Sequence, residues 1–150
     1  MEITTIAAAA LLTGAVTITG DDYNIERFLK PDTKVVRIVS DDGGLIDRYI
    51  RNYRILKMRR IQVQIVGRCV SACMMYMKLP GTCAEPGSQF WAHTPWLTNY
   101  DRYEREAIEE LMRQYYVPSV VTYINRRGGI WKIGTENYMK IKASNHLPAC

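Results

Sequence analysis

Several short stretches of the chain place apolar side chains with the period of a β-strand. Residues 34–40 are mostly β-branched and apolar, as in a buried strand, and residues 61–67 alternate apolar side chains with glutamines. Residues 15–19 alternate more weakly and end at a Gly-Asp-Asp turn signal. The same pattern predicts two further short strands at residues 89–93 and 138–142.

A helical period separates these strands. From residue 45 to residue 56 apolar side chains recur three and four positions apart, and the opposite face is basic. Residues 71–79 are apolar almost all round, which indicates a buried helix. A longer, charged helix is expected to start within residues 98–101, to break or kink at Pro118 and to resume to about Tyr123.

The order strand, turn, helix, strand over residues 34–67 is a βαβ unit, and such a crossover implies parallel strands. The sequence therefore predicts an α/β fold with βαβ units and a mostly parallel sheet. A chain of 150 residues has the length of one domain and can bury a sizeable core. We expect residues 1–150 to form a single domain.

Composition and charge narrow the function classes. Apolar residues make up 47% of the chain and charged residues 23%, which excludes a disordered or collagen-like protein. The net charge of +5 is only mildly basic and no nucleic-acid-binding motif accompanies it, so no nucleic-acid partner is expected. No apolar run is long enough for a membrane span.

The N-terminal residues 1–16 admit two interpretations. The apolar run 6–16 has the length of a signal-peptide core, which would mean export to an envelope compartment such as a periplasm. No Lys or Arg precedes Arg27, however, so the basic region that normally opens a signal peptide is missing. The alternative is that these residues form the first buried element of the domain.

The four cysteines do not have the spacing of a metal site, so no metal and no cofactor are expected. Cys73 lies in the apolar helical stretch and is interpreted as a small buried residue. A disulfide between Cys83 and Cys150, or one formed by Cys69, would require an oxidising compartment.

Three segments that each follow a predicted strand carry the candidate chemistry: Ser40-Asp41-Asp42-Gly43-Gly44, Cys69-Val70-Ser71-Ala72-Cys73 and His93-Thr94-Pro95. Open α/β sheets place their sites at the carboxyl ends of the strands, so these segments should converge. Ser71 begins an apolar helix, whose free N–H groups favour negative charge. His93 is the one histidine outside the C-terminal tail and could take the serine proton, provided the two side chains lie within or near hydrogen-bond reach.

The order of these segments resembles the Clp protease proteolytic subunit family, within the crotonase-like fold. It is closest to the small Clp-protease-like proteins of bacterial envelopes and phage genomes, which carry a Cys-x-Ser-Ala-Cys segment matched by residues 69–73. The resemblance implies that Ser71 is the nucleophile and His93 the general base. It further implies an oxyanion hole formed by the N–H groups of Ala72 and of Gly43 or Gly44. Together with the side chains of Ser71 and His93, these groups would form the active site.

The third member of the catalytic triad departs from the family pattern. The family's aspartate precedes the last strand, but this chain has no Asp after Asp101, and that region contains Glu136 and Asn137. Asn137 is the candidate that would orient the imidazole, since Asn fills that role in some cysteine proteases. Glu136 and a Ser-His dyad stay open as alternatives.

The sequence thus predicts a serine peptidase that acts on peptides or proteins and, like the family it resembles, forms a homo-oligomer. The alternative is a catalytically inactive domain of the same fold that serves as an oligomeric scaffold or binding module. Whether a group hydrogen-bonds the second imidazole nitrogen of His93 should discriminate between the peptidase and the inactive domain.

Overall fold

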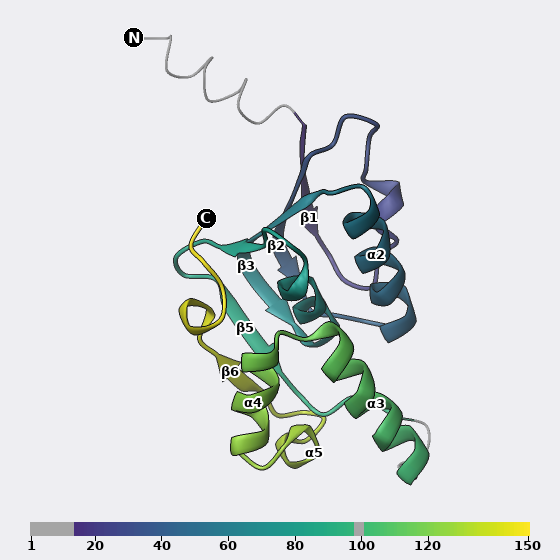
Figure 1. The fold of residues 1–150 in the computed structure, drawn as a ribbon, viewed down its shortest axis with the longest axis vertical. Coiled ribbons are helices and arrows are strands. Elements are labelled where there is room, and N and C mark those ends of the chain that lie inside the picture. The colour runs from purple at the N-terminus through teal and green to yellow at the C-terminus, as the bar shows by residue number, and fades with distance from the viewer. Residues whose placement is uncertain (1–13, 98–100) are drawn as a thin grey trace.

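The computed structural model describes residues 14–97 and 101–150, in which helices pack on a central six-stranded sheet (Figure 1). The strands are β1 (Ala15–Thr19), β2 (Val35–Asp41), β3 (Gln62–Val70), β4 (Cys83–Ala84), β5 (Gln89–Ala92) and β6 (Met139–Ile141). The α-helices are α2 (Ile46–Met58), α3 (Arg102–Tyr115), α4 (Pro118–Arg126) and α5 (Ile130–Ile133), and the 3-10 helices are η1 (Ile25–Arg27), η2 (Ser71–Lys78) and η3 (Ala143–Asn145).

The sheet is mostly parallel, which confirms the predicted α/β class. Its strand order is β1-β2-β3-β5-β6, with β4 paired to β3, and only the β5–β6 pair is antiparallel. The β2–α2–β3 segment is the βαβ unit expected from the sequence, and its two strands pair directly in parallel. The carboxyl ends of β2, β3 and β5 therefore lie at one edge of the sheet.

The buried faces of the elements explain this arrangement. Val36, Ile38, Val63 and Ile65 alternate along β2 and β3 and are fully buried. Helix α2 packs on η2, and η2, which is buried over most of its length, packs in turn on β3 and β5. Figure 1 shows α3, α4 and α5 together beside β5 and β6, below α2 in this view.

The predicted elements differ from the observed ones mainly at their ends. Strand β1 has the predicted bounds, whereas β3 continues to Val70 and so leads directly into Ser71. Pro118 breaks the long helix rather than kinking it, because it occupies the first turn of α4, where a missing N–H costs nothing. The short helix α5 was not predicted.

The N-terminal alternatives concern residues 1–16, of which 1–13 lie outside the described part of the chain. Residues 15 and 16 belong to β1 and are half-buried at the edge of the sheet. In residues 14–97 and 101–150, no helix has both the length and the apolar character needed to cross a membrane.

Candidate active site

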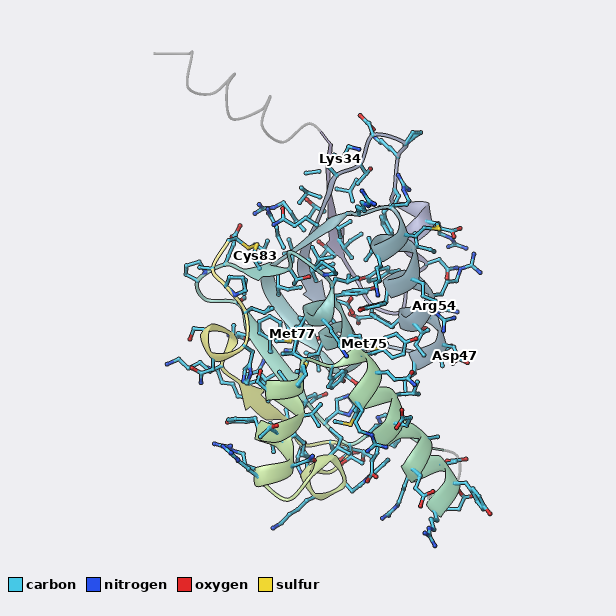
Figure 2. The ribbon with its side chains drawn as sticks, in the orientation of Figure 1. Lys34, Asp47, Arg54, Met75, Met77 and Cys83 are labelled. Carbon is cyan, nitrogen blue, oxygen red and sulfur yellow. A yellow bond between two sulfur atoms is a disulfide. The ribbon has the colours of Figure 1, made fainter. Side chains whose placement is uncertain are left out.

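A cavity of about 890 Å³ opens at the carboxyl edge of the sheet, between the start of α2, η2 and α3. Its volume lies within the range of sites that bind small molecules or peptide side chains. Met75 on η2 and Asp47 on the first turn of α2 both line it, and Figure 2 labels these two side chains. The cavity is also lined by the nucleophile, base and oxyanion-hole residues predicted from the sequence, namely Gly43, Gly44, Ser71, Ala72 and His93.

Ser71 has an unusual backbone conformation for a residue with a side chain. Its φ angle is +58°, in the left-handed region, which costs about 1–2 kcal/mol for a residue other than glycine. It is the first residue of η2 and follows β3 without an intervening loop. The Tyr116 hydroxyl donates a 3.0 Å hydrogen bond to the Ser71 carbonyl oxygen, which helps to hold this sharp turn. Backbone strain of this kind is concentrated at functional sites.

The Gly43-Gly44 loop lies directly against this turn. A Cβ atom on Gly43 would lie 2.9 Å from the Val70 carbonyl oxygen and 3.1 Å from the Ser71 Cβ. The φ angle of Gly43 is +87°, which side chains rarely adopt. Glycine is therefore required at this position on two independent grounds, backbone conformation and close approach.

One N–H group in this loop has no hydrogen-bond partner among the residues that the structure describes. The N–H groups of Asp42 and Leu45 donate to the side chains of Asp21 and Asp22, and the Gly43 N–H donates to Asp41 Oδ1 at 2.9 Å. The Gly44 N–H donates to no atom of residues 14–97 or 101–150. Of the two glycine N–H groups left open by the sequence, that of Gly43 is therefore already hydrogen-bonded, whereas that of Gly44 has no such bond within the described part of the chain.

His93 is held by its own backbone surroundings. Its Nδ1 lies 2.8 Å from the Thr94 carbonyl oxygen, and because a carbonyl only accepts, Nδ1 carries the proton. This leaves the Nε2 lone pair free to accept a proton. Thr94 is itself anchored, since its hydroxyl donates to the Ile130 carbonyl oxygen at 2.6 Å and accepts from the Gly134 N–H at 2.8 Å.

Among the described residues no hydrogen bond joins Asn137 to His93. The partner of Nδ1 is the Thr94 carbonyl, whereas Asn137 is exposed and its amide nitrogen lies near Gly134. Glu136 is exposed as well. In this structure the Thr94 carbonyl, adjacent to the histidine, occupies the position in which one of these two side chains was expected to orient the imidazole.

Ser71 and His93 line the same cavity, but within the described ranges no hydrogen bond joins them. A different serine and histidine do make contact: Ser119 Oγ and His146 Nδ1 lie 2.7 Å apart. Neither Ser119 nor His146 lines the cavity. This second pair therefore lies outside the cavity that contains Ser71, and it supplies matched control residues for experiments.

A buried carboxylate beneath the glycine loop was not predicted from the sequence. Asp41 is fully buried and accepts hydrogen bonds from the hydroxyls of Tyr23 and Tyr49 as well as from the Gly43 N–H. Tyr49 in turn packs against Tyr76, which bonds Asn52. Burial raises the pKa of Asp41 to about 6, although its three hydrogen-bond donors act in the opposite direction. The carboxylate fixes the loop from below.

We expect Asp41 to make the stability of the protein depend on pH. Its pKa is about 6 in the folded protein against 3.8 ordinarily, so between these values the folded state binds more protons than the unfolded state. The free energy of unfolding of the wild type, minus that of Asp41→Asn, should fall by roughly 2–3 kcal/mol as pH rises from below 3.8 to above 6. Denaturant unfolding of both proteins across this range measures it, and a pH-independent difference would contradict it.

All four cysteines form disulfides. Cys69 bonds Cys73. Cys83, which Figure 2 labels, bonds Cys150 in the C-terminal segment. Cys73 is fully buried, as expected, but it is not an isolated thiol. The sequence left this pairing open because Cys69 and Cys73 lie on either side of a strand-to-helix junction, where their spacing alone does not decide which cysteines are bonded.

Within residues 14–97 and 101–150 no three His, Cys, Asp or Glu side chains gather closely enough to hold a metal ion. Comparison with models of known protein families and with curated protein sequences finds no match. The interpretation of the site therefore depends on its own geometry.

Proposed function

We propose that this protein is a serine hydrolase that cleaves peptide bonds, with Ser71 as the nucleophile and His93 as the general base. We propose further that its α/β domain is of the crotonase type found in Clp protease proteolytic subunits. The observation that carries the proposal is the convergence of the Gly43-Gly44 loop, the strained Ser71 turn and His93 on one cavity, from three segments far apart in the sequence.

In the proposed reaction, His93 Nε2 takes the proton of Ser71 Oγ as the oxygen attacks the substrate carbonyl carbon. The negative charge that develops on the carbonyl oxygen is stabilised by the N–H groups of Ala72 and Gly44. His93 then gives its proton to the departing amine, and an ester joins the substrate to Ser71. Water, activated by the same imidazole, hydrolyses this ester and restores the serine.

The surroundings of the site fit a peptide substrate. The cavity walls on η2 and α3 are apolar and include Met75, Ile108 and Met112, which suit an apolar side chain. The nearby arginine Arg48 pairs with Asp22 at 2.8 Å. The homo-oligomer implied by the resemblance stays a prediction.

A fluorophosphonate probe tests the proposal, because it forms a covalent bond only with an activated serine. We expect the wild type and Ser119→Ala to be labelled, with the adduct on Ser71 by mass spectrometry, and Ser71→Ala to be unlabelled. Ser119→Ala is the matched control, since Ser119 also contacts a histidine. Labelling that is absent from the folded wild type, or that follows Ser119, would overturn the proposal and favour the inactive scaffold.

A further inference from the structure

The Cys69–Cys73 disulfide encloses the residue proposed as the nucleophile. Its Cα atoms lie 5.4 Å apart, and the ring it closes contains five residues with Ser71 at the centre. Cys69 belongs to the end of β3, where it pairs with Asp41 of β2 and Phe90 of β5, and Cys73 belongs to η2. The bond therefore ties the first turn of η2 to a strand that is paired with a neighbour on each side.

The backbone at the centre of this ring has a conformation that a free chain would leave. The left-handed φ of +58° at Ser71 disfavours a residue with a Cβ and persists only where the surroundings enforce it. Two contacts enforce it from outside the ring, the hydrogen bond from Tyr116 and the close approach of Gly43. The disulfide is the one covalent constraint, and both of its cysteines are fully buried.

We propose that the Cys69–Cys73 disulfide is a positioning element of the site: it holds Ser71 in the left-handed conformation that presents its hydroxyl to the cavity, and hydrolysis depends on this bond. The inference rests on the proposed function. It assigns no reacting role to the cysteines, since neither sulfur lines the cavity. It assigns the bond a different task from that of Cys83–Cys150, which joins positions 67 residues apart and ties the C-terminus to β4.

The two disulfides allow an experiment that separates positioning from general stability. A disulfide that closes a long loop constrains the unfolded chain more than one that closes a short loop, so Cys83→Ala/Cys150→Ala should lower the melting temperature more than Cys69→Ala/Cys73→Ala. Activity should show the reverse order. At a temperature where both variants are folded, we expect kcat on a peptide ester to fall about 10²-fold or more for Cys69→Ala/Cys73→Ala, with a KM change below about threefold. The kcat of Cys83→Ala/Cys150→Ala should stay near that of the wild type.

A second measurement covers the case in which a double variant fails to fold. Wild-type protein is unfolded, reduced and refolded with its thiols free, then assayed before and after reoxidation, with alkylation and mass spectrometry to follow each cysteine pair. Fluorophosphonate labelling of Ser71 should return with the Cys69–Cys73 bond and not with Cys83–Cys150.

Full activity without the Cys69–Cys73 bond would overturn the inference and leave the proposed function intact. Losses of kcat that follow the loss of stability in both variants would also overturn it, since they would indicate a merely structural bond. An oxidised wild type without Ser71-dependent hydrolysis would overturn the proposed function and this inference together.

Discussion

Replacing His93 by alanine is expected to lower kcat/KM for a peptide ester by about 10² to 10⁴-fold, the usual contribution of a positioned general base. The reason lies in the hydrogen bond from Nδ1 to the Thr94 carbonyl, which fixes the tautomer and leaves Nε2 unprotonated. In the proposed mechanism the imidazole accepts the proton of the Ser71 hydroxyl, and the variant lacks that acceptor. Steady-state hydrolysis by purified wild type and variant measures the effect.

Two controls make this result specific. The chain has only one other histidine, His146, which lies outside the cavity, and His146→Ala should keep nearly the full activity. Asn137→Ala should stay within about threefold of the wild type, since Asn137 is exposed and the Thr94 carbonyl already holds the imidazole. A large loss in Asn137→Ala would show that the orienting group changes when substrate binds, and a larger loss in His146→Ala than in His93→Ala would contradict the assignment of the base.

The neutral carbonyl that holds His93 also has a consequence for the rate. A carboxylate in that position stabilises the imidazolium formed during attack, whereas a carbonyl orients the ring but carries no charge to balance it. The proposed enzyme is therefore expected to be slower than one with an aspartate in its triad. This interpretation agrees with the lack of any Asp after Asp101 in the sequence.

The sequence could predict those features that depend on a local pattern. Alternation along residues 15–19 and 34–40 and the apolar stretch 71–79 are local, so the strands and the buried helix appear where the pattern places them. The convergence of the three segments also follows from a local rule, because each comes after a parallel strand. The sequence could thus place the three motifs at one edge of the sheet.

Other features depend on irregularities that a regular pattern conceals. Strict alternation along β2 would place Ser40 inward after Val36 and Ile38, but the pairing of β2 with β3 shifts between Ile38 and Ser40. That shift turns Asp41 into the core instead, where it meets Tyr23. A bulge of this kind has no clear signature in one sequence, so the buried carboxylate could not be anticipated.

The partner of His93 escaped prediction for a different reason. Every residue has a backbone carbonyl, so a carbonyl that fills the orienting position leaves no trace in the choice of side chains. The search for a side chain therefore led to Asn137 by position along the chain alone. The disulfide pairing was similarly open, because four cysteines allow three connectivities and only the approach of the Cα atoms decides between them.

Replacing Gly43 by alanine is expected to cost about 10²-fold in kcat, the size of effect that follows when a catalytic group is misplaced by about 1 Å. The new Cβ would lie 2.9 Å from the Val70 carbonyl oxygen, 3.1 Å from the Ser71 Cβ and 3.2 Å from the Ala72 nitrogen. Two of these three atoms are backbone atoms, so the contact is relieved only if the glycine loop and the Ser71 turn move apart. That movement separates the N–H groups of Gly44 and Ala72, which are the oxyanion donors of the proposed mechanism.

A matched glycine isolates this effect from backbone strain. Gly87 has a φ angle of +86°, nearly that of Gly43, but a Cβ there would meet no atom within 4 Å. Both alanine variants therefore carry the left-handed cost of about 1–2 kcal/mol in the free energy of unfolding. Only Gly43→Ala should lose more free energy of unfolding than this. When both variants are assayed as folded protein, only Gly43→Ala should also have a lower kcat. Equal kcat in the two variants would show that the close packing of the loop against Ser71 does not serve catalysis, since the shared strain would then be the whole effect.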